Sequence, residues 1–194
     1  AGENGTYFQT VPFVLMAPEA GTYLESGGTR FTLGRDMVLV GAPVTARSIA
    51  NAPAVYGGPA REPSQWMAGD STAGKIVVLD VRPGPDGIRS TRGLGIRDPR
   101  FNGAALIAIV GFDLLPGEQR AAIMAGRLTI NSTLNPTATP VAFISDKAAS
   151  AFLGGDPSGM TSGATGRAVS GSVGFAPKQV AYAARNVVAV LRGS

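Results

Sequence analysis

Neither cysteine nor histidine occurs among the 194 residues of the chain. The absence of cysteine excludes disulfides, thiol nucleophiles and thiolate-bound zinc. The absence of histidine excludes Ser-His and Cys-His nucleophile pairs, the HExxH zinc motif and imidazole metal ligands. The thirteen acidic residues are scattered, without the Asp-x-Asp spacing of a calcium-binding loop. We therefore expect no catalytic residue, no metal site and no cofactor in this chain.

Charged residues are also sparse, at 15% of the chain. The net charge of +4 comes from fourteen arginines and three lysines against thirteen carboxylates, without a dense basic run interleaved with aromatic residues. No apolar stretch approaches the roughly twenty residues of a membrane span. The composition therefore predicts neither a nucleic-acid partner nor a membrane span.

Glycine and proline are abundant instead, at 27 and 14 residues, which favours short strands and many turns over long helices. The most strand-like stretch is Gly74–Val81, a run of apolar and β-branched residues that is followed by the turn-rich segment 82–87. It predicts a strand buried on both faces. Ala105–Val110 and Thr139–Ser145 predict a second and a third buried strand.

Short helices are predicted between and after these strands. Asp98 precedes a proline, which fits an N-cap with proline at the first helical position, so a brief helix should begin there. Pro116–Met124 predicts a helix that Gly126 stops. Asp146 is expected to cap a further helix over Lys147–Leu153. The fold class that follows is mixed α/β and β-rich, with two or three short helices.

The other strands are predicted from short local runs rich in Tyr, Phe, Val, Ile and Thr. In the last third of the chain, Arg167–Val173, Gln179–Ala183 and Asn186–Leu191 are expected to pair with one another as antiparallel strands, around a turn at 176–178. The segment before them, 157–166, predicts a loop within a single domain. Elsewhere, strands are expected at 6–16, 22–25, 29–33, 37–40, 50–56 and 127–132.

Three segments together carry a family pattern. Gly74–Leu79 resembles a Gly-Lys-Ile-Val strand, and Asn102–Ile109 resembles an Ala-Gly-Ala helix end that leads into an apolar strand. Thr139–Leu153 resembles an Ile-Pro-Val…Ile-Ser strand followed by a small Ala/Leu helix. In this order the segments resemble the protease-associated (PA) domain. The resemblance implies the swivelling β/β/α fold, a sheet sandwich with small helices.

The two ends of the chain indicate which group of PA domains the chain resembles. Ala1–Gln9 resembles the segment before the PA insertion of secreted M28-type zinc aminopeptidases, and Ala184–Ser194 resembles the segment that leads back into their catalytic domain. The resemblance implies that residues 1–194 form a single PA domain, with 1–16 and 184–194 as connecting strands to a catalytic domain absent from this chain. It also implies a secreted or periplasmic metallopeptidase. Its zinc would lie in the catalytic domain, which would be the partner of this domain in cis.

Five residues are candidates for contact with a substrate or with the catalytic domain. The arginines lie in the polar segment 82–100, and a guanidinium group suits bidentate pairing with a carboxylate. The favoured alternative is a solvated loop with surface ion pairs that contribute little stability. The single tryptophan could contact a peptide, although covering the local core is the favoured interpretation. The candidates are Trp66, Arg82, Arg89, Arg92 and Arg97.

The expected function is that of a non-catalytic PA domain, which shapes substrate access to an aminopeptidase or mediates protein or peptide contacts. The alternative is a stand-alone module that binds a peptide or protein without a peptidase partner. A free-standing hydrolase is disfavoured because the chain has no Gly-x-Ser-x-Gly elbow.

Overall fold

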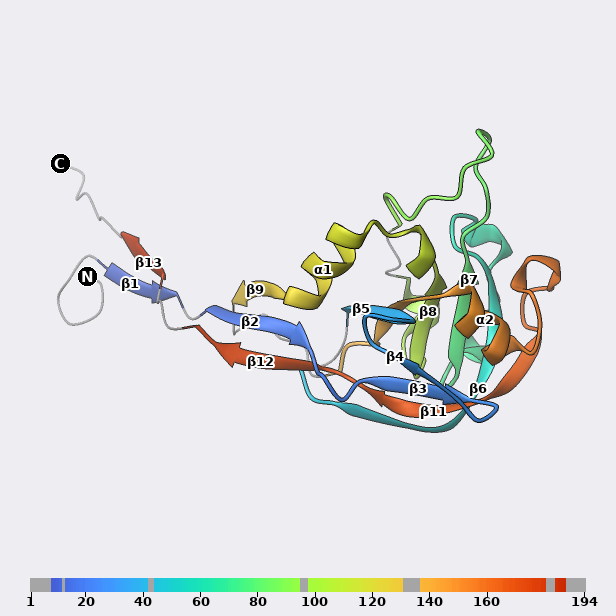
Figure 1. The fold of residues 1–194 in the computed structure, drawn as a ribbon, viewed down its shortest axis with the longest axis horizontal. Helices are drawn as coiled ribbons and strands as arrows, with labels where there is room; N and C mark the ends of the chain where they lie inside the picture. The colour runs from blue at the N-terminus through green and yellow to red at the C-terminus, as the bar shows by residue number, and fades with distance from the viewer. Residues whose placement is uncertain are drawn as a thin grey trace, which may run out of the picture.

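The computed structural model describes residues 8–11, 13–41, 44–94, 98–130, 137–180 and 184–187. These described residues form thirteen strands and two α-helices, arranged in three sheets (Figure 1). The predicted fold class, mixed α/β and β-rich with short helices, is confirmed. No helix in the described ranges is long and apolar enough to cross a membrane.

The largest sheet has eight strands in the order β4-β3-β11-β6-β7-β8-β10-β5. Its centre is parallel, because β6, β7, β8 and β10 all run in the same direction, and the outer pairs are antiparallel. The strands are β3 (Tyr23–Ser26), β4 (Thr29–Thr32), β5 (Met37–Gly41), β6 (Arg47–Pro59), β7 (Ile76–Asp80), β8 (Leu106–Val110), β10 (Val141–Ile144) and β11 (Thr165–Val173).

The central strand β7 is buried on both faces, as its sequence predicts. All five of its residues are buried, and so are all five of β8. Because side chains alternate along a strand, Ile76 and Val78 enter one apolar cluster together with Phe152, whereas Val77 and Leu79 enter another together with Phe101. The parallel sheet therefore separates two cores.

Helix α2 (Asp146–Leu153) covers one face of this sheet. It buries four residues, among them Phe152, whose ring lies edge-on to that of Phe31 with 5.4 Å between centroids. The opposite face is covered by irregular segments and single turns of 3-10 helix: η2 (Pro63–Gln65), η3 (Gly69–Ser71) and η4 (Pro99–Phe101). A turn before the helix α1, η5 (Phe112–Leu114), contributes to a third small cluster.

The observed helix ends agree with the sequence predictions at three positions and differ at one. Gly126, at φ 88°, ends α1 (Gly117–Ala125), and the Asp98 side chain accepts a hydrogen bond from Arg100 N at the start of η4. Both were predicted. The prediction that Asp146 caps α2 is wrong, because the Ser145 hydroxyl accepts a hydrogen bond from Ala148 N and Asp146 is the first helical residue. The helix ends at a left-handed glycine, as predicted, with φ 78° at the position after Leu153.

Two smaller sheets join the early and late parts of the chain. One has the order β12-β2-β9, formed by β12 (Phe175–Gln179), β2 (Phe13–Pro18) and β9 (Arg127–Ile130). The other pairs β1 (Phe8–Val11) with β13 (Ala184–Val187) in antiparallel register. Figure 1 shows β1 and β13 at the opposite end of the molecule from α2.

The predicted mutual pairing of the last three strands is wrong. β11 pairs with β3 and β6, β12 with β2, and β13 with β1. The expected turn at 176–178 lies inside β12, where Pro177 is opposite Met16. This proline is tolerated because β12 is an edge strand, which does not need every N–H as a donor. Parts of the predicted strands, at 181–183 and 188–191, lie outside the described residues.

The contact between α2 and β11 makes Gly166 sensitive to substitution. An added methyl group would lie 2.7 Å from the Cα of Leu153 and against the carbonyl oxygen of Phe152. We expect Gly166→Ala to lower the free energy of unfolding by about 1–3 kcal/mol, as overpacking does. Urea denaturation would measure this loss. The control is Gly21→Ala, where no atom lies within 4 Å of the new methyl group. Equal stability of the two variants would contradict the packing described.

Candidate functional site

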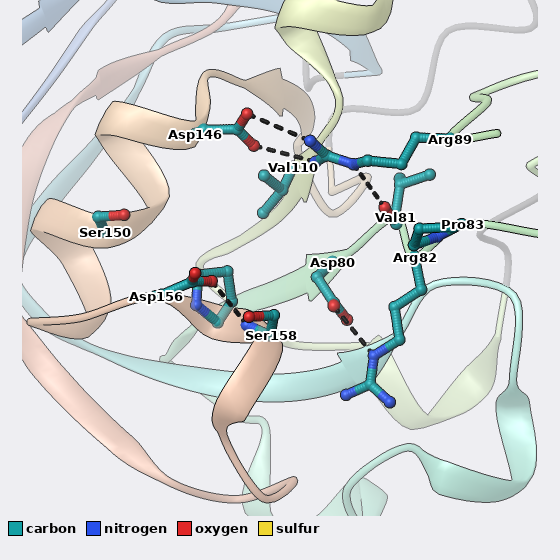
Figure 2. Close-up of a pocket in the computed structure, with 11 residues that line it drawn as sticks. Asp80, Val81, Arg82, Pro83, Arg89, Val110, Asp146, Ser150, Asp156 and Ser158 are labelled. Atoms are coloured by element: carbon teal, nitrogen blue, oxygen red, sulfur yellow. Dashed lines mark hydrogen bonds and ion pairs between the residues drawn. The ribbon is translucent and has the colours of Figure 1, made fainter. Parts of the chain in front are cut away.

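A cavity of about 350 Å³ lies at the carboxyl ends of β7 and β8. This edge of a parallel sheet is where α/β proteins commonly bind ligands. The lining comes from the end of β7 and the loop after it, from β8, from α2, and from η7 (Pro157–Gly159) with the residue before it (Figure 2). The lining residues are Asp80, Val81, Arg82, Pro83, Arg89, Val110, Asp146, Ser150, Asp156, Pro157 and Ser158.

The floor of the cavity contains a buried carboxylate that is fully hydrogen-bonded. Asp80 is 5% exposed. Its Oδ1 accepts a hydrogen bond from the Tyr56 hydroxyl at 2.6 Å, and its Oδ2 accepts one from Arg82 Nε at 3.1 Å. Arg82 Nη2 also donates to the Tyr56 oxygen at 2.9 Å. A buried charge is costly unless it is paired in this way, so the three side chains form one closed network.

The network affects the titration of its tyrosine. Burial, and then the hydrogen bond to the Asp80 carboxylate, raise the pKa of the Tyr56 hydroxyl above its ordinary value. The hydroxyl therefore stays protonated across the physiological range and remains a donor to Asp80.

Arg89 connects three parts of the cavity wall. Its Nη1 and Nη2 donate to the two carboxylate oxygens of Asp146, at 3.2 and 2.9 Å, and its Nε donates to the carbonyl of Val81 at 2.8 Å. The hydrogen bond to Asp146 raises the pKa of the Arg89 guanidinium. The loop after β7 is thereby attached both to the end of that strand and to the first residue of α2, as Figure 2 shows.

A third carboxylate lies on the wall formed by η7. Asp156 Oδ1 accepts a hydrogen bond from Ser158 N at 2.9 Å, and this bond lowers the pKa of the Asp156 carboxyl. Among the described residues, Asp156 forms no salt bridge. The lining thus holds three carboxylates and two guanidinium groups. Asp156 is the one of these carboxylates that forms no salt bridge, although the nearby charge of Arg89 also lowers its pKa.

The structure brings together two of the four predicted arginines. Arg82 and Arg89 both line the cavity, and both form ion pairs with aspartates. Arg92 is exposed and does not line it, although its carbonyl accepts a hydrogen bond from Arg61 at 2.6 Å. Arg97 lies outside the described residues. A role for these arginines in binding a substrate or another domain stays a prediction.

Trp66 lies away from the cavity, on the face of the sheet opposite α2. Its ring is 5.0 Å from that of Phe101, and its Nε1 donates to the carbonyl of Pro59 at 2.6 Å. The Arg100 guanidinium lies over the ring, 4.9 Å from its centroid. The tryptophan packs against the second apolar cluster, in agreement with the favoured interpretation that it covers the local core.

Sequence reasoning missed most of the acidic side of the cavity. The sequence places Asp80 at the end of the predicted buried strand, at the same edge as the arginine-rich segment, and Asp146 was interpreted as a helix cap. Asp156 had a usable signal, because it precedes Pro157 just as Asp98 precedes its proline. Both aspartates cap a 3-10 turn. Nothing local in the sequence indicates that Asp156 lies near the end of β7.

Within the ranges that the structure describes, no three His, Cys, Asp or Glu side chains lie close enough together to hold a metal ion. Comparison with known proteins finds no matching family model, no similar curated protein and no similar solved structure.

The buried network predicts an alkaline limit to stability. A group whose pKa is raised on folding stabilises the fold below its unfolded pKa, about 10 for tyrosine, and this contribution is lost as the pH rises above that value. We expect Tyr56→Phe to lower the free energy of unfolding by about 1–2 kcal/mol at neutral pH, because it removes the hydroxyl that bonds Asp80 and Arg82. The variant should also show a weaker decline in stability above pH 10.

Urea denaturation across a pH series would test both parts of this prediction. Tyr23→Phe is the control, since the Tyr23 ring is only partly buried and lies under the Arg30 guanidinium. If Tyr56→Phe and Tyr23→Phe showed the same stability and the same pH dependence, the buried network would not contribute as described.

Proposed function

We propose that residues 1–194 form a non-catalytic protease-associated domain of a secreted or periplasmic M28-like zinc aminopeptidase. In this proposal the domain shapes substrate access or mediates protein or peptide contacts. Its partner is its own catalytic domain in cis, and that domain binds the zinc. The sequence resemblance at 74–79, 102–109 and 139–153 and at both ends of the chain is the starting point for this proposal.

The observation that carries the proposal is the pairing of the early and late segments. β1 pairs with β13, from Phe8 opposite Val187 to Val11 opposite Ala184. Further along, β2 pairs with β12. The chain thus enters and leaves the body of the domain side by side. Adjacent entry and exit are what allow one domain to be inserted into another, so this pairing supports 1–16 and 184–194 as connecting strands.

The alternative is a stand-alone module that binds a peptide or protein. The cavity at the ends of β7 and β8 favours it, because polar side chains on loops, held by a rigid sheet, are the usual setting of a binding site. The two functions differ in what the parent gene encodes. An aminopeptidase requires zinc ligands in the same reading frame, and a stand-alone module does not.

The first test uses the purified chain and its reading frame. We expect the chain to hydrolyse no aminoacyl anilide. Metal analysis of the purified chain should find well below one equivalent of zinc per chain. The frame that follows Ser194 should encode a His/Asp/Glu ligand set. Hydrolysis that survives metal-free purification would contradict the proposal, and a frame without zinc ligands would favour the stand-alone module.

The second test removes the domain from the parent enzyme. Val11 and Ala184 are opposite each other, about 5 Å apart as in any antiparallel pair, so a short turn can join them. We expect the parent lacking residues 12–183 to hydrolyse single-residue anilides at a similar kcat/KM, but to show an altered kcat/KM on longer peptides. Unchanged kinetics on both substrate classes would contradict a role in substrate access.

A further inference from the structure

The charges in the cavity are unevenly matched. Arg82 is paired with Asp80, and Arg89 is paired with Asp146. The lining residues thus carry three negative and two positive charges. Asp156 is attracted to Arg89 without a salt bridge, and one negative charge remains in excess. A cavity with an excess carboxylate favours a ligand that carries a positive charge.

An anionic ligand does not suit this position. The amino end of a helix at the edge of a parallel sheet often binds phosphate or carboxylate groups through its free N–H groups. At the amino end of α2, Asp146 N donates to the Asp113 carboxylate at 2.9 Å, and Ala148 N donates to the Ser145 hydroxyl. The carboxylates of Asp113 and Asp146 already occupy the place where an anion would bind.

The lining changes from buried at the floor to exposed at the mouth. Val81 and Val110 are 2% and 1% exposed and form the floor together with Asp80. At the mouth, Ser150, Asp156 and Ser158 are exposed. The volume is near the lower end of the range for small-molecule sites. The cavity therefore suits one end of a chain, with the remainder of the ligand outside.

An ammonium group has three N–H donors and no acceptor. Acceptors for it are present at the mouth: the Asp156 carboxylate, to which the Ser158 side chain also hydrogen-bonds, and the hydroxyls of Ser150 and Ser158. Figure 2 shows all three side chains on the wall formed by α2 and η7. Val110 at the floor and the buried Pro157 are apolar lining residues that can pack against a small side chain.

We propose that this cavity binds the protonated amino terminus of a short peptide, with the Asp156 carboxylate as its counter-ion. The inference deepens the proposed function. It rests on that proposal in one respect, namely that the molecule carrying the ammonium group is a peptide. Recognition of the ammonium group itself depends on residues of this chain alone.

The first experiment compares three probes by amide NMR titration of the purified chain. The probes are Leu-Gly amide, its N-acetylated form and n-butylamine. We expect the free dipeptide amide to shift the amide signals of Val81 and Ser158, and the acetylated form to bind at least about tenfold more weakly, because acetylation removes the charge. Butylamine should also bind more weakly than the dipeptide, since it lacks the peptide group and the branched side chain.

The second experiment uses a matched pair of variants. Asp156 and Asp98 each precede a proline, and each accepts a hydrogen bond at 2.9 Å from the N–H two residues later. Asp98 does not line the cavity. Asp156→Asn is expected to weaken binding of the dipeptide amide about tenfold, whereas Asp98→Asn should leave it unchanged. Unaltered amide spectra outside the substituted turns would show that both variants are folded.

The outcomes separate this inference from the proposed function. Equal binding of the free and acetylated probes, no binding of either, or equal affinity of Asp156→Asn and the unsubstituted chain would overturn it. If butylamine bound as tightly as the dipeptide amide, the claim that a peptide occupies the cavity would be overturned. Selective binding of the free dipeptide, in a chain whose reading frame encodes no peptidase, would support the site and contradict the aminopeptidase proposal.

Discussion

The burial of the Asp80 carboxylate at the end of β7 constrains much of the surrounding structure. A charge in this position needs donors from within the protein, and they come from two different segments. Tyr56 reaches it from the neighbouring parallel strand β6, in which Tyr56 is opposite Val78 and Pro59 is opposite Asp80. Arg82 reaches it from the loop that follows. The bond from Tyr56 links the end of β7 to β6, and the bond from Arg82 holds the start of the following loop against the same carboxylate.

The same network explains how a long loop is held in place without disulfides. Once Arg82 is fixed, Arg89 can bond the carbonyl of Val81 and the carboxylate of Asp146. Arg61 adds hydrogen bonds to the carbonyls of Ser90 and Arg92. Guanidinium groups, with five donors each in a planar fork, connect the loop to the body of the domain. This use of arginine fits a chain with fourteen arginines and three lysines.

The predictability of the fold varied with the kind of signal. The buried strands β7 and β8 were predictable because continuous β-branched and apolar runs have few other stable environments, and the end of α1 was marked by Gly126. The partner strands of β11 and β12 were not predictable. Alternation of apolar and polar residues specifies which face of a strand is buried, but it does not specify which strand lies beside it. The start of α2 was misplaced because Ser145 and Asp146 are both good N-cap residues.

The candidate site was less predictable than the fold. Segment 82–100 was identified as rich in arginine, but nothing in the sequence distinguishes Arg82 and Arg89, which line the cavity, from Arg92, which does not. The difference arises from the aspartates that face them, Asp80 and Asp146, and these are separated by 66 positions that the parallel sheet brings together. Such a pairing depends on topology, which local patterns do not contain.

The paired segments also determine how the domain would respond to tension. Hydrogen bonds in an antiparallel pair run perpendicular to the strands, so a force that separates Phe8 from Val187 loads the bonds between β1 and β13 one pair at a time. The next bonds loaded are those between β2 and β12, and the eight-stranded sheet follows only after them. The strand pairs would therefore separate one after another, beginning with β1 and β13. Movement of a neighbour attached at these ends would separate these pairs before it reached the cavity.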